Sequence, residues 1–402
     1  MTTQPDRGPE ERFDLIVVGL GAMGAATTYQ ARRQGLSVLG IDRHHPPHTL
    51  GSTHAETRVT RLAVGEGPQY LPFVARSHEI WRELEARSGE ALLHLSGGYI
   101  ITDPEPVAGQ RWEDFVVATD RIAAEAGIPF HLVDPSMVPS AGQPGPPPRI
   151  RGLDGKRIGF EPTGGVVMAE RAVAVQLDLA KDDGATVRTG ETVTAIEPAS
   201  NGVTVVTDRT RYRADRAVLA TGPWLPELAD QTDIPSLAVT RQTVFWFEVD
   251  DVAAFGTDRF SFIIWAGQSD DDYVGVFPIP PGGTPALKVL GEQFAETTDP
   301  HTVDRTVSDD EIADFHRRLV AGRIDGVTDR CVKAQVCLYT NTPDDHFLID
   351  TVPGTDRVLQ LSPCSGHGFK HSAAIGEAVA AWAAGTSTTL DLRPFARRAN
   401  RA

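Results

Sequence analysis

Three glycines near the start of the chain have the spacing of a phosphate-binding loop. They are Gly19, Gly21 and Gly24 in the pattern G-x-G-x-x-G, with Ala22 and Met23 between the last two. The first glycine permits a tight turn, the second lets the backbone approach a pyrophosphate, and the third lets a helix pack closely on a strand. A helix that begins here offers free N–H groups to phosphate oxygens. These residues therefore predict a dinucleotide-binding turn.

An acidic residue follows this turn at the distance expected of a ribose ligand. Asp42 ends the next apolar run, about 20 residues after the third glycine, and Arg43 follows it. A carboxylate here repels the extra phosphate of NADP, which leaves NAD and FAD as the two candidate cofactors. A second turn (Thr221-Gly222-Pro223-Trp224) follows another apolar run. It resembles the second dinucleotide contact of glutathione-reductase-type flavoproteins, and an ordinary strand-to-loop turn is the alternative.

Hydrophobic periodicity predicts the elements that must position these residues. Short apolar runs predict strands at 13–19, 37–42, 186–208, 216–222 and 358–361, and helical spacing predicts helices at 22–34, 70–88, 169–180, 308–322 and 371–384. Alternation over 240–290 predicts an antiparallel sheet interrupted at 270–272. Six prolines within 135–148 predict a loop or linker. Because nucleotide-type strands recur toward both ends, we expect a discontinuous nucleotide domain with an inserted substrate domain.

Composition narrows the function classes. The 402 residues are 41% hydrophobic, and 54 acidic against 38 basic side chains give a net charge of −16. Such a surface repels nucleic acid and anionic membranes. Three cysteines (Cys331, Cys337 and Cys364) are too few for a disulfide framework and fit a reducing compartment. With no apolar run of about 18 residues and no signal peptide, we expect a cytoplasmic protein without a membrane segment. The spacing of His346, His367 and the nearby aspartates predicts no metal site.

Further motifs occur near both ends of the chain. Near the N-terminus these are Pro46–Thr49, Gly51-Ser52, the T-R-V-T-R run Thr57–Arg61 and Gly65–Gly67; near the C-terminus they are Cys337–Phe347 and the S-G-H-G-F-K run Ser365–Lys370. Together, from about Phe13 to about residue 390, these motifs resemble the monomeric sarcosine oxidase and N-methyltryptophan oxidase family. Its members are flavin-dependent amine oxidases of the D-amino-acid-oxidase-like superfamily.

The resemblance implies an α/β fold with a discontinuous, Rossmann-type, glutathione-reductase-like FAD-binding domain and a substrate domain built on a mainly antiparallel sheet. The expected FAD-binding segments are 13–90, 150–225 and 328–390, and the expected substrate-domain segments are 91–149 and 226–327. FAD is expected to be covalent through a thioether from Cys337, with a buried apolar thiol as the alternative. The other expected cofactor ligands are Gly19, Gly21, Ala22, Met23, Gly24, Asp42, Arg43, Ser52, His54, Arg58, Thr221, Gly222, Trp224, Gly366, His367, Gly368, Phe369 and Lys370.

The resemblance also assigns catalytic roles. Arg61 and Lys370 match ligands of a substrate carboxylate, for which a guanidinium fork is suited. Lys288 matches a lysine that serves oxygen activation, since a fixed cation stabilises an anion developing on O₂; a solvated strand lysine is the alternative. Tyr339 lies in the C-L-Y-T run. Where sarcosine-oxidising relatives carry a pocket histidine, the ungapped alignment from Lys288 places Glu292. It is expected to contact a polar or cationic group of a larger substrate, and the alternative is that it turns to solvent or pairs with a nearby cation.

We therefore expect a monomeric oxidase of secondary or N-methylated amines or amino acids. It would transfer a hydride to FAD, release an imine that hydrolyses, and reduce O₂ to H₂O₂. The alternative within the same fold is a tailoring oxidase of a cyclic imino acid or natural-product intermediate. A nucleotide-binding scaffold without turnover and a nicotinamide-linked dehydrogenase are the alternatives from other classes.

Overall fold

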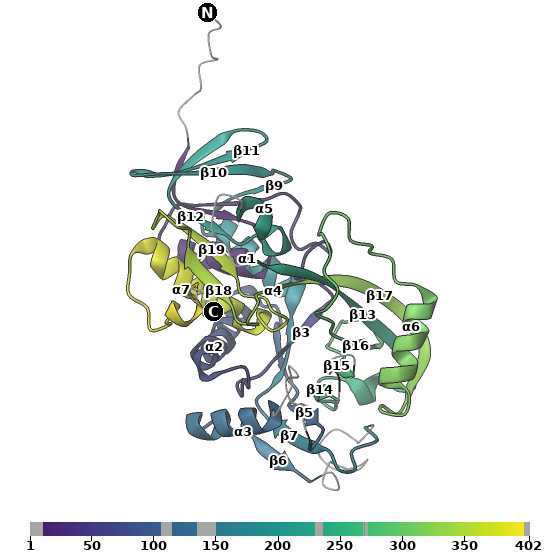
Figure 1. Ribbon diagram of the computed structural model, residues 1–402. Coiled ribbons are helices and arrows are strands. Elements are labelled where there is room, and N and C mark those ends of the chain that lie inside the picture. Colours follow the sequence, from purple (N-terminus) through teal and green to yellow (C-terminus); the bar gives the residue numbers. More distant parts are fainter. Residues whose placement is uncertain are drawn as a thin grey trace, which may run out of the picture. The chain divides into compact units, whose positions relative to one another are not determined.

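The computed structural model describes residues 11–105, 115–134, 150–229, 236–267, 269 and 272–397 (Figure 1). The chain forms two compact units, and each is described by itself. The first unit comprises residues 1–53, 171–238 and 340–402, and the second comprises residues 54–170 and 239–339.

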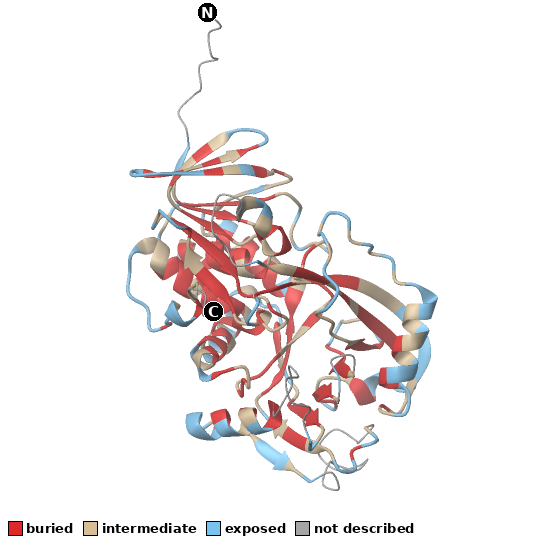
Figure 2. Ribbon diagram, viewed as in Figure 1, coloured by how far each residue is buried: buried red, intermediate tan, exposed pale blue. Residues whose placement is uncertain are grey.

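The first unit is built on an eight-stranded sheet in the order β10-β11-β12-β1-β2-β9, with β19 beside β12 and β18 beside β19. Strands β9, β2, β1, β12 and β19 run parallel, whereas β10, β11 and β18 pair antiparallel. The bounds are β1 Arg12–Val18, β2 Val38–Asp42, β9 Thr186–Thr189, β10 Val193–Ala199, β11 Gly202–Thr207, β12 Arg211–Leu219, β18 Leu348–Thr351 and β19 Val358–Ser362. Strands β2 and β19 are buried along their whole length, and β1 and β12 are buried toward their C-terminal ends (Figure 2), which explains their apolar runs. Strand β9 is only partly buried.

Helices complete this unit. They are α1 Ala22–Arg33, α4 Ala169–Asp182 (whose first two residues belong to the second unit), α5 Leu225–Ala229 and α7 Ser372–Ala384, with 3₁₀ turns at Gly222–Trp224, Phe369–His371 and Arg393–Phe395. Small residues let α1 and α7 pack closely. A Cβ added at Gly376 of α7 would lie 2.5 Å from the carbonyl carbon of Ala26 in α1. The alanine-rich sequences therefore match a tight helix pair.

The second unit contains a larger and a smaller sheet. The larger has the order β17-β13-β16-β15-β14-β5-β7-β6, and the smaller has the order β3-β8-β4. From β13 to β6 the pairs are antiparallel, except that β14 and β5 run parallel. The bounds are β3 Thr57–Thr60, β4 Leu93–Leu95, β5 Gly98–Thr102, β6 His131–Val133, β7 Arg157–Glu161, β8 Gly165–Met168, β13 Ala238–Val249, β14 Phe262–Ala266, β15 Tyr273–Phe277, β16 Leu287–Leu290 and β17 Val327–Asn341. Its helices are α2 Leu71–Ser88, α3 Phe115–Ala126 and α6 Asp309–Phe315, which continues as a π-helical turn over His316–Val320, and its 3₁₀ turns are Pro68–Tyr70 and Val252–Phe255.

Alternation along β13 and β16 divides the larger sheet into two faces. Phe245, Phe247 and Leu287 point into a core that is closed by Phe315 and Leu319. The alternate residues of β13, Val244 and Trp246, point to the opposite face. There they cluster with Ala55, Ala286 and Cys337. Lys288 follows Leu287, so it shares this second face, and the strand alternation places a lysine beside the predicted flavin-linking cysteine.

Most predicted elements are confirmed, with bounds shifted by a few residues at most for β1, α1, β2, α4, β19 and α7. The segment 186–208 contains the three strands β9, β10 and β11. The single helix expected at 308–322 is instead α6 and a π-helical turn. The mainly antiparallel middle sheet is confirmed, with one parallel pair. The predicted loop at 135–148 and residues 270 and 271 lie outside the described residues.

The compact units differ from the expected domain boundaries at four segments. Residues 54–90, 150–170 and 328–339 belong to the second unit, and residues 226–238 belong to the first. The reason is strand pairing: β3 forms a sheet with β8, and β17 extends the sheet of β13. The assignment of FAD-binding segments stays a prediction.

Candidate functional site

The glycine loop of the first unit has the geometry of a phosphate-binding turn. Gly19 follows β1 with φ of +87°, and a Cβ there would lie 2.6 Å from the carbonyl oxygen of Ala220. A Cβ on Gly24 would overlap the carbonyl of Gly19. Gly21 is the extended N-cap of α1, whose first turn carries no acidic residue. The loop can therefore bring backbone N–H groups to an anionic ligand.

Asp42 fixes this loop from the end of β2. Its buried carboxylate accepts hydrogen bonds from the backbone N–H of Leu20 (2.8 Å) and of His44 (2.7 Å). A carboxylate has about four lone-pair sites, so it keeps acceptor capacity for a ribose hydroxyl. Arg43, the next expected cofactor ligand, lies over the ring of Trp224, 5.6 Å from its centroid. It also forms an ion pair with Glu227 at 3.1 Å.

Thr221 indicates that a polar group belongs beside the glycine loop. A Cβ on Gly19 would lie 2.9 Å from the Cα of Thr221, so the two turns are in contact. The Thr221 hydroxyl is buried and has no hydrogen-bond partner among the described residues. A buried hydroxyl without a partner is costly, and an external polar ligand would satisfy it. The residues present therefore fit a bound dinucleotide.

The glycine-rich loop before α7 completes the first unit's candidate residues. Gly366 has φ of +79°, and a Cβ on Gly368 would overlap the carbonyl of Pro363, so both positions favour glycine. The His367 ring stacks on Phe347, with centroids 4.8 Å apart. Buried Lys370 donates from Nζ to the carbonyl of His367 at 2.9 Å. The structure thus holds this lysine against the loop that the sequence singled out, together with Phe369 at the start of the 3₁₀ turn.

In the second unit, Lys288 is buried and anchored. Only 3% of it is exposed. Its Nζ donates to the carbonyl of Thr57 at 2.6 Å and to the Thr57 hydroxyl at 3.3 Å, and it lies 4.0 Å from the centroid of the Phe277 ring. Burial lowers the pKa of Lys288 well below its usual range, and the charge of Arg58 lowers it further. The alternative of a solvated strand lysine is therefore wrong.

Cys337 lies on β17 within a group of basic side chains. Its Sγ is 3.8 Å from Nδ1 of His54, and both residues are buried. Burial raises the pKa of the Cys337 thiol, while the charges of Arg58 and Lys288 oppose that rise. Arg58 donates from Nη1 to the carbonyls of His54 (2.6 Å) and Thr57 (2.8 Å). The structure thus brings together four residues that the sequence singled out separately: His54, Arg58, Lys288 and Cys337.

A strained turn separates His54 from Thr57. Ala55 and Glu56 both have positive φ, of 71° and 67°, which is unusual for residues with a Cβ. Glu170 accepts from the backbone N–H of Glu56 at 3.2 Å. The Glu56 carboxylate in turn binds Lys333 at 3.0 Å and the Thr284 hydroxyl. These contacts hold in place the strained backbone that carries the acceptor of Lys288.

Arg61 is paired with a carboxylate of its own chain. Its Nη2 donates to both carboxylate oxygens of Glu66, each at 2.8 Å, and its Nη1 donates to the carbonyl of Ala63 at 2.5 Å. The guanidinium carbon also lies 5.1 Å from the ring centroid of Phe115. Arg61 is only 2% exposed, so it is a buried arginine rather than a surface one. One of its terminal nitrogens, Nη2, binds a carboxylate in this structure, and a substrate carboxylate at Arg61 stays a prediction.

Glu292 and Tyr339 form a pair. The Tyr339 hydroxyl donates to Oε1 of Glu292 at 3.0 Å, and the rings of Tyr339 and Phe294 are 6.1 Å apart. Burial raises the pKa of Tyr339 well above its usual range, and the Glu292 carboxylate raises it further. Tyr339 therefore stays a hydrogen-bond donor near neutral pH. Glu292 is half-buried and does not simply turn to solvent.

The sequence reasoning missed several partners of these residues. Thr57 and Glu66 lie inside quoted motifs, but no pattern showed that they contact Lys288 and Arg61. Ser52 stays a predicted cofactor ligand in the segment just before His54. The described residues contain no group of three His, Cys, Asp or Glu side chains placed to hold a metal ion, and no helix among them is long and apolar enough to cross a membrane.

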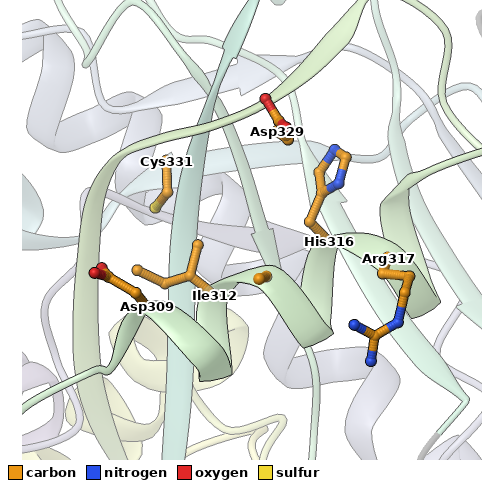
Figure 3. Close-up of a pocket in the computed structure, with 7 residues that line it drawn as sticks. Asp309, Ile312, His316, Arg317, Asp329 and Cys331 are labelled. Carbon is orange, nitrogen blue, oxygen red and sulfur yellow. The ribbon is translucent and has the colours of Figure 1, made fainter.

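A separate cavity of about 470 Å³ lies in the second unit (Figure 3). Its lining residues are Asp309, Ile312, Ala313, His316, Arg317, Asp329 and Cys331. They come from α6, the π-helical turn that follows it and β17. None of the predicted site residues lines this cavity.

Comparisons with known proteins give a family and a fold. The model of the FAD dependent oxidoreductase family matches residues 14–382. The N-methyl-L-tryptophan oxidase of Salmonella arizonae is 33% identical over 386 residues, which are 96% of this chain and 98% of that protein. The monomeric sarcosine oxidase of Streptomyces avermitilis is 33% identical over 373 residues, 92% of each chain.

Two solved structures have the same fold. NikD, described as an unusual amino acid oxidase essential for nikkomycin biosynthesis, superposes with a TM-score of 0.80 at 23% identity, over 96% of this chain and 97% of that one. Glycine oxidase from Geobacillus kaustophilus gives a TM-score of 0.77 at 18% identity, over 98% of this chain and 100% of that one.

Proposed function

Because the chain belongs to the FAD dependent oxidoreductase family, we propose that it oxidises secondary or N-methylated amines, chiefly amino acids. FAD, when bound, accepts a hydride from the carbon next to the amine nitrogen and passes the electrons to O₂, which yields H₂O₂. The imine product hydrolyses in water, so an N-methyl substrate gives formaldehyde and the demethylated amine. The protein is proposed to act as a monomer in the cytoplasm, and its three free cysteines fit that compartment.

The observation that carries this proposal is the buried face shared by Lys288 and Cys337. Lys288 is 3% exposed and is held in place by Thr57, and no carboxylate among the described residues is hydrogen-bonded to it. Burying an amine without a carboxylate partner costs free energy of folding. Its presence here therefore points to a role in function rather than in stability. A fixed cation favours the negative charge that develops when oxygen is reduced. We assign that role to Lys288.

The nucleotide end of FAD is assigned to the first unit. The glycine loop would bind the pyrophosphate, Asp42 would bind a ribose hydroxyl, and the unpartnered Thr221 hydroxyl would bind a polar group of the cofactor. Cys337 would carry the flavin through a thioether. Because burial keeps its thiol protonated, the link requires a proton acceptor, and His54 at 3.8 Å is placed for that task.

The substrate carboxylate is assigned to Arg61 and Lys370. Arg61 already holds a carboxylate, that of Glu66, through two hydrogen bonds. A substrate carboxylate would compete with Glu66 for the same fork, which offers a planar paired donor set. Charge-assisted bonds of this kind contribute about 1.5–3 kcal/mol each.

A second candidate function follows from the pair Glu292–Tyr339. A carboxylate held by a tyrosine hydroxyl at 3.0 Å suits a substrate with an added polar or cationic group. This favours a cyclic imino acid or another larger amine within the same chemistry. Glu292→Gln keeps the size and removes the charge. A peroxide-coupled panel of N-methyl, cyclic and basic amino acids should rank substrates differently for this variant, and an unchanged ranking contradicts a pocket role for Glu292.

Acid precipitation of the purified protein tests the cofactor assignment. Yellow colour that stays in the pellet, and that moves to the supernatant in Cys337→Ser, supports a covalent FAD at Cys337. Colour released from the wild-type protein contradicts the covalent link but keeps the flavoenzyme. A protein that stays colourless after incubation with FAD would contradict the cofactor assignment and favour a nicotinamide-linked enzyme or a scaffold.

A further inference from the structure

Glu161 is a buried carboxylate that no motif singled out. It ends β7 and is 1% exposed. Removing an ionised carboxylate from water costs several kcal/mol unless hydrogen bonds replace the lost solvation. In this protein three donors offset part of that cost: the backbone N–H of Leu62 at 2.6 Å, the backbone N–H of Ala63 at 3.2 Å, and the Thr163 hydroxyl at 2.8 Å.

Two of these donors belong to the turn that carries Arg61. The strand β3 ends at Thr60, so Leu62 and Ala63 lie beyond its ladder of hydrogen bonds. The Glu161 carboxylate takes the place of a partner strand for both N–H groups. The carbonyl of Ala63 then accepts Nη1 of Arg61 at 2.5 Å. A short path of contacts therefore runs from Glu161 through the backbone of Ala63 to the guanidinium.

We propose that Glu161 is a positioning residue that orients the Arg61 guanidinium for the carboxylate of the substrate. This inference rests on the proposed amino-acid oxidase function. Glu161 holds the backbone of Ala63, and the Ala63 carbonyl holds Nη1 of Arg61, so Glu161 fixes the plane of the guanidinium. The other terminal nitrogen, Nη2, binds a carboxylate, which in this structure is that of Glu66. Fork recognition depends on the plane of the guanidinium, so a tilt of this turn weakens carboxylate binding without altering the oxidation of the amine.

Glu161→Gln is the direct test. Glutamine is nearly the same size, but its amide nitrogen would face a backbone N–H, so one donor of the turn loses its acceptor. Thr163→Val is a milder variant that removes one donor and leaves the carboxylate. Glu191→Gln is the matched control. Glu191 is also buried, at 2% exposed, and binds the hydroxyls of Thr207 at 2.7 Å and Tyr212 at 3.4 Å, but it belongs to the first unit.

The readout is a ratio that a merely structural change would not move. For each holoenzyme, kcat/KM is measured with N-methyl-L-tryptophan and with N-methyltryptamine, which lacks the carboxylate. Glu161→Gln should lower this ratio about 10- to 100-fold, chiefly through KM, and Thr163→Val should lower it a few-fold. Glu191→Gln should leave the ratio unchanged. Equal losses for both amines, or an unchanged ratio in a folded Glu161→Gln protein, overturn the proposal.

Acetate binding separates this inference from the proposed function. Its dissociation constant is measured by calorimetry on the wild type, Arg61→Lys and Glu161→Gln holoenzymes. Weaker acetate binding in both variants supports the positioning role. If neither amine is oxidised by the wild type, only the proposed function is overturned, and the positioning role is still supported by the acetate result. Acetate binding that depends on Arg61 but not on Glu161 overturns the positioning role alone. Binding that is independent of Arg61 overturns both the carboxylate assignment and the inference.

Discussion

Replacing Lys288 by methionine should separate the two halves of the catalytic cycle. Methionine keeps the length of the side chain and removes its charge. The ammonium is held 2.6 Å from the carbonyl of Thr57 and 4.0 Å from the Phe277 ring centroid, so it has little freedom and little access to water. Oxidation of the amine does not need this charge in the proposed role, whereas reduction of oxygen does. We therefore expect flavin reduction to stay comparatively intact while reoxidation slows.

The size of the effect follows from Coulomb's law. A unit charge about 4 Å from a developing negative charge contributes about 4 kcal/mol at an effective dielectric constant of about 20. That energy corresponds to roughly 1000-fold in rate. Loss of a single preorganised donor in other enzymes costs about 10²–10³-fold. We expect the second-order rate constant for reaction of the reduced protein with O₂ to fall about 100- to 1000-fold in Lys288→Met.

Anaerobic stopped-flow spectroscopy measures the two steps apart. The protein is first reduced by substrate without oxygen and is then mixed with oxygenated buffer. Because burial lowers the pKa of Lys288 well below its usual range, the wild-type reoxidation rate should decline as pH rises through that lowered pKa, and the variant should lack this decline.

Lys156→Met is the matched control. Lys156 is also a largely buried lysine of the second unit, but it is paired with Asp103 and, among the described residues, has no contact with the turn that holds Lys288. Its removal should change reoxidation no more than a few-fold. Equal losses of reduction and reoxidation in Lys288→Met, or the same slowing in Lys156→Met, would refute the assignment of oxygen activation to Lys288.

Three further predictions follow from the geometry. Gly24→Ala should purify with little FAD and a lower Tm, because its Cβ overlaps the carbonyl of Gly19; normal FAD absorbance at saturating cofactor would contradict the loop assignment. Burial, and to a lesser extent the charge of Arg82, lowers the pKa of His78 from 6.5 to about 4. As pH falls, the unfolded chain therefore takes up this proton before the folded one does. The free energy of unfolding should fall by up to about 3 kcal/mol as pH is lowered from about 6.5 to about 4. In His78→Gln, urea unfolding across this range should show a smaller decline, and an identical decline would show that other groups dominate. Glu66→Gln should lower KM for carboxylate-bearing amines a few-fold in steady-state assays, because its amide competes less well for Arg61; a raised KM would instead show that Glu66 helps to hold the arginine.

Local sequence patterns predicted the parts of the fold that depend on near neighbours. The apolar run before Gly19 and the alanine-rich run after Gly21 correspond to β1 and α1. Alternation around Lys288 correctly indicated a strand. By contrast, β17 was not predicted, because its first half is exposed and carries polar residues that hide the alternation.

Long-range pairing explains what the sequence could not show. Thr57 binds Lys288 across 231 residues, and Glu161 binds Leu62 across 99 residues. Periodicity in one chain carries no signal for such pairs, since each partner looks ordinary in its own segment. The resemblance predicts functional roles for Arg61 and Cys337, but only the folded chain shows Glu66 on the arginine and His54 beside the thiol.

Anaerobic reduction of the flavin by an amine tests the central claim most directly. The purified yellow protein is mixed without oxygen with sarcosine, N-methyl-L-tryptophan and a cyclic imino acid in turn, and the visible flavin band is followed. We predict that at least one of these amines bleaches the band and that admitting air restores it with formation of H₂O₂. A flavin band that none of these secondary amines bleaches, in a protein that chemical reductants do bleach, would contradict the account.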